Sequence, residues 1–146
     1  MKIAVSLIGT WRLASYEAQD AQGKITHPLG KNLIGLLCYT KEGFMSVQVM
    51  RTDRLGYSSG DLHISLIEEM AAAANGYVAY AGRFSVDEAA TMVTHHVQLS
   101  LSPTWVGTDQ TRSLALRSGH LYLRGGFVLI NGTSQAPLTV WEKISS

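Results

Sequence analysis

Short stretches in which apolar and polar residues alternate make up most of the chain, a pattern typical of β-strands with one buried face. Turn residues separate the stretches, as at Lys41-Glu42-Gly43, Ser118-Gly119 and Asn131-Gly132. Tight turns join antiparallel neighbours, so consecutive stretches are expected to pair. The pattern predicts strands at residues 10–18, 33–40, 44–52, 77–86, 91–101, 110–118, 120–129 and 137–144.

One segment between the third and fourth strands follows a helical period instead. Its periodic residues are Ile64, Ile67, Met70, Ala71 and Ala74. Their spacing predicts a helix over roughly 64–75. Ser65 and Glu68 have the spacing of a capping box, and Asn75-Gly76 is a stop signal. Two roles stay open for this helix: a lid over the barrel, or a cover packed on one barrel end.

An antiparallel sheet of about eight strands tends to close into a barrel. We therefore expect an all-β fold, an antiparallel up-and-down barrel with one inserted helix. Gly82, Gly125 and Gly126 fall inside strand patterns, where they indicate bends or bulges that help a sheet to curl. The length of 146 residues suits one domain, so residues 1–146 are expected to form a single unit.

Composition narrows the classes of partner. The chain has 12 Lys and Arg against 11 Asp and Glu, and a formal charge of +1 gives little electrostatic basis for binding nucleic acid. Cys38 is the only cysteine, so an internal disulfide is excluded and a reducing compartment is expected. The N-terminal residues do not resemble a signal peptide, and no apolar run approaches the roughly 18 residues of a membrane span. These features predict a cytoplasmic protein without a membrane partner.

Several motifs along the chain resemble those of a known family. Gly9-Thr10-Trp11, at the head of the first strand, resembles the Gly-x-Trp opening of lipocalins. Further matching segments are residues 28–30, 35–40, 43–46, 80–84, 94–97, 103–108 and 138–142. Together they are similar to the bacterial and fungal lipocalin-like domain proteins, which are small intracellular barrels. The resemblance implies an interior cavity for a small apolar or amphipathic molecule, and some barrels of this shape are cyclases or isomerases in natural-product pathways.

The apolar parity of each strand indicates which side chains point into the barrel. His95 shares the parity of Val93 and Val97, so it is expected inside and His96 outside. Glu17 shares the parity of Trp11 and is also expected inside. The residues that we take as candidate ligand contacts on this basis are Trp11, Arg51, Tyr80, Phe84, His95, Gln110 and Arg112.

Three functions fit these residues. In the first, Tyr80, His95 and Arg112 converge in an apolar cavity and bind a small molecule with an acidic or carbonyl oxygen. In the second, an isomerase or cyclase, His95, Tyr80 and Glu17 act as catalytic residues while Arg112 steadies developing negative charge. In the third, Glu17 pairs with Arg112, the interior is filled, and the protein acts through its surface or as a homodimer.

Other chemistries find less support. Adjacent His95 and His96 face opposite sides of a strand and cannot chelate one metal together, so neither a metal nor another cofactor is expected. A Ser-His-Asp arrangement can be assembled from any serine-rich chain, so serine content does not favour a hydrolase. Trp105 lies on a predicted loop, where it either gates the barrel mouth or packs into the core.

Overall fold

The computed structural model describes residues 2–145. Its helices are α1 (Ile3–Leu7) and α2 (Ile67–Asn75), and one 3₁₀ turn spans Pro103–Trp105. The strands are β1 (Gly9–Asp20), β2 (Ile25–Thr26), β3 (Leu33–Tyr39), β4 (Phe44–Arg51), β5 (Tyr77–Asp87), β6 (Met92–Ser100), β7 (Asp109–Arg117), β8 (His120–Gly125), β9 (Val128–Ile130) and β10 (Thr133–Ser145).

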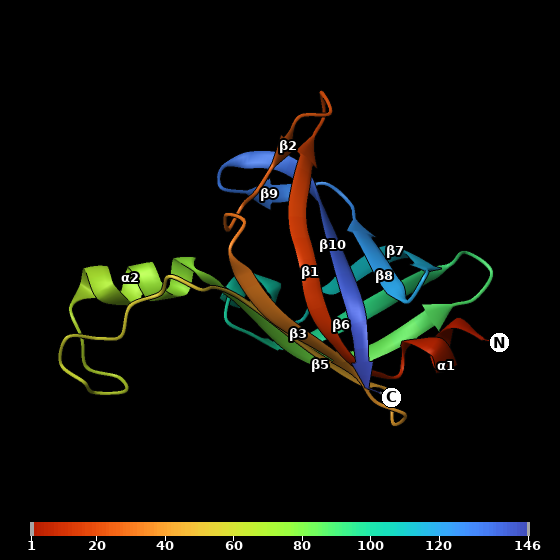
Figure 1. The fold of residues 1–146 in the computed structure, drawn as a ribbon, viewed down its shortest axis with the longest axis horizontal. Coiled ribbons are helices and arrows are strands. Elements are labelled where there is room, and N and C mark those ends of the chain that lie inside the picture. Colours follow the sequence, from red (N-terminus) through yellow and green to blue (C-terminus); the bar gives the residue numbers. More distant parts are fainter. Residues whose placement is uncertain (1, 146) are drawn as a thin grey trace.

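Eight long strands form a closed antiparallel barrel (Figure 1). They pair in the order β1-β3-β4-β5-β6-β7-β8-β10, and β10 pairs back onto β1. This closing ladder runs from Thr10 opposite Ser145 to Asp20 opposite Gln135. The short strands β2 and β9 extend β1 and β10 at one end, where Figure 1 shows them at the top. The predicted up-and-down barrel is confirmed.

Two of the predicted turns have the backbone that a two-residue hairpin requires. Ser118 and Gly119 have φ of 51° and 78°, and Asn131 and Gly132 have φ of 51° and 84°. Positive φ at both central positions defines the type I′ turn, whose twist matches that of the flanking strands. These turns join β7 to β8 and β9 to β10.

The predicted continuous strand over 120–129 is wrong. The chain leaves the β8 ladder after Gly125, and residues 128–130 form β9, which pairs with the start of β10. Two consecutive glycines, Gly125 and Gly126, interrupt the strand because glycine contributes no side-chain packing to hold it straight. The last strand accordingly begins at Thr133, four residues before the predicted start at Pro137.

A short N-terminal helix that the alternation pattern did not predict packs on one end of the barrel. The backbone N–H groups of Ile3 and Ala4 donate to the Glu88 carboxylate at 2.8 and 3.1 Å. Leu7 is completely buried, and its carbonyl oxygen accepts from Trp11 Nε1 at 2.9 Å. α1 therefore contributes an apolar side chain to the core at this end.

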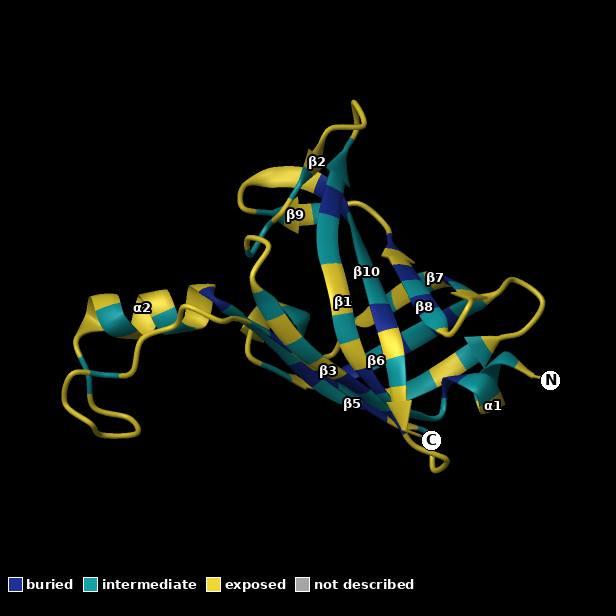
Figure 2. Cartoon of the chain, viewed as in Figure 1, coloured by how far each residue is buried: buried dark blue, intermediate teal, exposed yellow. Residues whose placement is uncertain are grey.

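Helix α2 projects away from the barrel, as Figures 1 and 2 show, and covers neither end. None of its residues is buried. It begins at Ile67 rather than near residue 64, because the Asp61 carboxylate accepts from the Ile64 N–H at 2.7 Å and holds a turn there. The predicted Ser65 and Glu68 capping box is also wrong, since Glu69 bonds back to the Leu66 N–H at 3.2 Å.

Candidate functional site

A pocket of about 120 Å³ is lined by side chains from most of the barrel strands. Its wall is mostly apolar, with Leu37, Val47 and Val49 on one side and Leu123 and Trp141 on the other. Polar groups enter from three adjacent strands: Tyr80 from β5, His95 from β6 and Arg112 from β7. An apolar pocket with a few convergent polar groups is the usual form of a small-molecule site.

The side chain of His95 lies between two tyrosine hydroxyls. Tyr39 Oη is 2.6 Å from Nε2, and Tyr80 Oη is 2.8 Å from Nδ1. Only 2% of His95 is exposed to solvent. The predicted inward orientation of His95 and Tyr80 is confirmed, and both ring nitrogens are occupied by hydrogen bonds within the protein.

Burial makes this cluster electrically neutral. Desolvation, with smaller contributions from Arg112 and His96, lowers the pKa of His95 to about 3. Desolvation likewise raises the pKa of Tyr80, an effect that Arg112 opposes. Burial raises the pKa of Tyr39 well above its usual range. At neutral pH the imidazole and both phenols are therefore uncharged, and Arg112 supplies the positive charge.

Arg112 reaches the pocket through space left by a glycine. A Cβ atom at Gly125, opposite Arg112 on β8, would lie 2.8 Å from Arg112 Nη1. The guanidinium lies over the Trp105 ring, with Cζ 5.8 Å from the ring centroid. Its hydrogen bond goes to the Thr111 carbonyl oxygen at 3.4 Å. The ion pairs of residues 2–145 do not include Arg112, so the predicted Glu17–Arg112 pair is wrong for the described chain.

A register shift in β1 explains the position of Glu17. The ladder with β10 slips between Leu13 and Ser15, which reverses the side-chain parity of the rest of the strand. Tyr16 consequently lines the pocket, and Ala18 is buried with 1% exposed. Glu17 lies on the opposite face, so its predicted inward orientation is wrong.

Four other predicted ligand contacts do not line this pocket. Trp11 is buried beside α1, where it bonds Leu7. Phe84 packs edge-on against Tyr39, with ring centroids 4.8 Å apart. Gln110 donates to Thr108 Oγ1 at 2.9 Å. Arg51 is exposed and forms a bidentate pair with Asp53, at 3.0 and 2.9 Å.

The candidate ligand contacts from the sequence omit several aromatic residues of the site, among them Trp141, which lines the pocket from β10. Tyr39 shares the parity of Leu37 on β3, so the argument that placed Tyr80 would also have found it. Tyr16 could not be found this way because the bulge reverses its parity. Trp105, which the sequence places at the barrel mouth or in the core, lines the pocket and meets Tyr80 edge-on, with 5.4 Å between ring centroids.

The pocket has its outer boundary at the ends of β5 and β6. Val78, Tyr80, Trp105 and Leu129 line both the pocket and a surface depression of about 370 Å³. Leu129 is 80% exposed, so it presents an apolar side chain at the rim. The pocket and the depression therefore share residues of the 3₁₀ turn and of β9.

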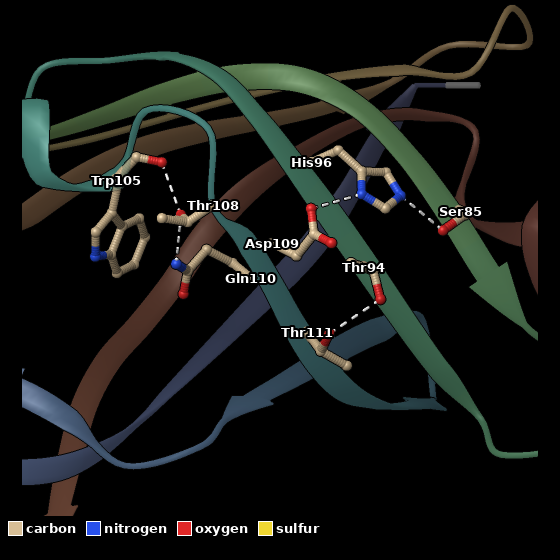
Figure 3. A network of polar contacts seen from close by, with 8 residues as sticks. All are labelled: Ser85, Thr94, His96, Trp105, Thr108, Asp109, Gln110 and Thr111. Atoms are coloured by element: carbon tan, nitrogen blue, oxygen red, sulfur yellow. Dashed lines mark hydrogen bonds and ion pairs between the residues drawn. The ribbon is translucent and has the colours of Figure 1, made fainter.

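A second polar network lies on the outer wall of the barrel (Figure 3). Ser85 Oγ is 2.9 Å from His96 Nε2, and His96 Nδ1 is 2.8 Å from Asp109 Oδ1. His96 faces outward as predicted. Serine, histidine and aspartate are hydrogen-bonded in the same sequence as in a Ser-His-Asp triad. The three side chains lie, however, on an exposed sheet surface, where the backbone N–H groups bond the neighbouring strand and do not form an oxyanion hole. This network is therefore a cross-strand surface contact.

The segment Gly56-Tyr57-Ser58-Ser59-Gly60 matches the Gly-x-Ser-x-Gly sequence motif of a nucleophile elbow. An elbow places its serine on a sharp turn between a strand and a helix. Here the segment lies in the exposed loop before α2, and Ser58 Oγ bonds Glu69 Oε1 at 3.2 Å rather than a histidine. The motif therefore has no catalytic context in this fold.

Residues 2–145 contain neither a membrane-spanning helix nor a cluster of metal-binding side chains. Their helices are all too short or too polar to cross a bilayer. The same residues contain no group of three or more His, Cys, Asp or Glu side chains arranged to hold a metal ion.

Comparison with known proteins places the chain in a family. Residues 8–144 match the model of the lipocalin-like domain. The 4'-hydroxy-3'-methoxypropiophenone carrier protein ppsC of Aspergillus oryzae is 34% identical over 107 residues, which are 68% of this chain and 96% of that protein. Two solved structures, each 14% identical and covering 94% of this chain, are a lipocalin-like protein of Bacteroides uniformis (TM-score 0.46, 98% of that chain) and an uncharacterized protein of Bacteroides eggerthii (TM-score 0.47, 99% of that chain). The family match covers nearly the whole sequence, and the chain belongs to the lipocalin-like domain family.

Proposed function

We propose that the protein is a small-molecule carrier that holds a compact aromatic ligand in the barrel pocket. The observation that carries this proposal is the convergence of Tyr80, His95 and Arg112 on one pocket whose remaining wall is largely apolar. The apolar wall suits a hydrocarbon ring, and the polar side suits an oxygen that accepts hydrogen bonds.

The size of the pocket limits the ligand. A pocket of about 120 Å³ is smaller than the roughly 300 Å³ typical of sites for drug-sized molecules. It is close to the ~150 Å³ of an apolar cavity that binds benzene. One aromatic ring is therefore the expected size of the buried group, with substituents extending toward the rim at Leu129.

The related carrier protein supports the same ligand class. Its name specifies a propiophenone, an aromatic ketone with one ring, a phenol and a methoxy group. Such a molecule combines an apolar ring with acceptor oxygens, as the pocket requires. We extend this to the present chain as an aromatic ketone or phenol of similar size.

Binding without chemistry is better supported than the isomerase or cyclase alternative. A general base must be free to take a proton. Both nitrogens of His95 are already bonded to tyrosines, and its pKa is lowered to about 3. Glu17, the other expected acid/base residue, lies on the opposite face of β1.

A cytoplasmic location and a homodimer stay predictions.

Titration of the intrinsic fluorescence tests the proposal, because Trp105 and Trp141 both line the pocket. Addition of 4'-hydroxy-3'-methoxypropiophenone is expected to quench this emission saturably, and chromatography is expected to recover the compound unchanged. Arg112→Met should weaken binding, while Arg124→Met on the exposed side of β8 should not. Saturable binding that Arg112→Met leaves intact would place the ligand elsewhere, and conversion of the compound would favour an enzyme.

A further inference from the structure

The two tyrosines beside His95 have different surroundings, and this difference sets the direction of their hydrogen bonds. Tyr80 lines the pocket, so its hydroxyl can meet a bound molecule. Tyr39 lies deeper, with 2% exposed, and its ring packs against Phe84. The hydroxyl of Tyr39 has a single described partner, His95 Nε2.

A neutral imidazole has one N–H donor and one acceptor nitrogen, so one tyrosine donates to His95 and the other accepts from it. If Tyr39 accepted from an Nε2–H group, its own hydroxyl hydrogen would be buried without an acceptor, which is unfavourable. If Tyr39 donates to Nε2, its buried hydroxyl hydrogen has an acceptor. The second arrangement puts the proton of His95 on Nδ1, from where it donates to Tyr80 Oη.

This arrangement leaves the Tyr80 hydroxyl hydrogen directed to the pocket. Since Tyr80 Oη already accepts from His95, it is committed to act as a donor toward a ligand. A hydrogen bond received by a hydroxyl also polarises it and strengthens the bond that it donates. Tyr39 and His95 are thus positioning residues for Tyr80.

Arg112 adds a second set of donors to the same pocket. Guanidinium groups only donate, and among residues 2–145 no carboxylate pairs with this one. A cation at a partly desolvated wall is stabilised by an anion in hydrogen-bonding contact. The polar side of the pocket therefore offers donors and positive charge.

We propose that Tyr80 and Arg112 together select an anionic oxygen, and that an acidic phenol binds here as its phenolate, with its proton released to solvent. This inference rests on the proposed function and specifies the ionisation state of the ligand. A para-acyl phenol suits the site because the phenolate charge is delocalised through the ring onto the carbonyl oxygen, which makes the phenol more acidic. His95 does not take the proton, since both of its nitrogens are engaged.

The direction of the hydrogen bonds can be tested without any ligand. The ¹⁵N chemical shifts of His95 distinguish a protonated ring nitrogen from an unprotonated one. Protonation at Nδ1 is expected in the wild-type protein. Protonation at Nε2 would overturn the assignment of Tyr80 as a dedicated donor.

The ionisation state is tested with two ligands, 4'-hydroxy-3'-methoxypropiophenone and its 3',4'-dimethoxy analogue, which cannot ionise. At a pH below the phenol's own pKa, the wild-type protein should bind the phenol about tenfold more tightly than the dimethoxy analogue. The bound phenol should also show the long-wavelength absorption band of a phenolate. Arg112→Met should abolish both the preference and the band, so that the two ligands bind with equal affinity.

The outcomes separate this inference from the proposed function. Equal binding of the two ligands without a phenolate band would overturn the inference and leave the carrier function in place. If neither ligand binds, the phenolate inference and the carrier function are both overturned. Tyr80→Phe supplies a second variant, in which the ratio of the phenol affinity to the analogue affinity should fall about threefold.

Discussion

Gly125 provides the space that the guanidinium of Arg112 occupies, because a Cβ atom at position 125 would lie 2.8 Å from Arg112 Nη1. Gly125→Ala should therefore displace Arg112 from the pocket wall. The same Cβ would approach Pro137 Cγ at 2.9 Å, so a loss of about 1–3 kcal/mol in stability is also expected.

Affinity for the hydroxyaryl ketone should fall about tenfold in Gly125→Ala, the size expected for losing a hydrogen bond to a charged group. Fluorescence titration measures the affinity, and urea unfolding measures the stability. Gly126→Ala is the matched control, since a Cβ there would meet nothing within 4 Å. Unchanged affinity in Gly125→Ala would show that Arg112 does not depend on this glycine.

Gly82 lies at the bulge where β5 and β6 change register, and it permits a very close backbone approach. A Cβ at position 82 would lie 1.9 Å from the His96 carbonyl oxygen. Neither atom belongs to a flexible side chain, so Gly82→Ala should cost about 3 kcal/mol or more in urea unfolding. Gly56→Ala, in an open loop, should stay within about 0.5 kcal/mol of the wild type.

Leu7 of α1 fills a core position at the end of the barrel, and it is completely buried. Leu7→Ala is expected to lower the free energy of unfolding by about 2–5 kcal/mol, because it removes apolar contact and leaves a cavity. Val5→Ala in the same helix is the control, since Val5 is 56% exposed and should change stability by less than about 1 kcal/mol. Equal effects of the two substitutions would contradict the docking of α1.

His95 makes stability depend on pH in the acid range. Its folded pKa of about 3 lies below the usual value of 6.5, so the unfolded chain binds the proton more tightly. The stability that His95 contributes is complete above about pH 6.5 and falls by about 1.4 kcal/mol per pH unit as the pH drops toward 3.

Urea unfolding at several pH values between 4 and 6.5 measures this slope. His95→Gln should reduce the slope by about one proton equivalent, whatever its effect on overall stability. His96→Gln on the exposed outer face is the control and should leave most of the slope in place. Identical slopes in the wild type and in His95→Gln would show that the imidazole is not held neutral.

The Ser85, His96 and Asp109 network is expected to contribute little to either stability or chemistry. Its ion pair is exposed, with 40% and 65% of the His96 and Asp109 side chains accessible to solvent. Asp109→Asn should change the free energy of unfolding by less than about 1 kcal/mol. Hydrolysis of an activated ester should proceed equally in the wild type and in Ser85→Ala, and a loss of turnover in the variant would restore the hydrolase hypothesis.

The sequence by itself determined the barrel and the interior position of its central histidine. Alternation with a period of two is a local property of each strand, and Ser118-Gly119 and Asn131-Gly132 have the turn chemistry that joins neighbours. The inward orientation of Tyr80 and His95 follows from the same local parity. A helical period near residue 70 likewise predicted α2, although its first turn depended on contacts from Asp61 and Glu69.

Tertiary structure decided which polar groups meet. Tyr39 and His95 are 56 residues apart, and strand register alone brings Oη to Nε2. One bulge in β1 places Tyr16 at the pocket wall and Glu17 on the opposite face, because a shift of one residue reverses the face to which every later side chain of the strand points. Gly125 made room for Arg112 across a strand pair. Local patterns specify the direction of a side chain relative to its own strand, whereas the composition of the site depends on long-range pairing that those patterns do not encode.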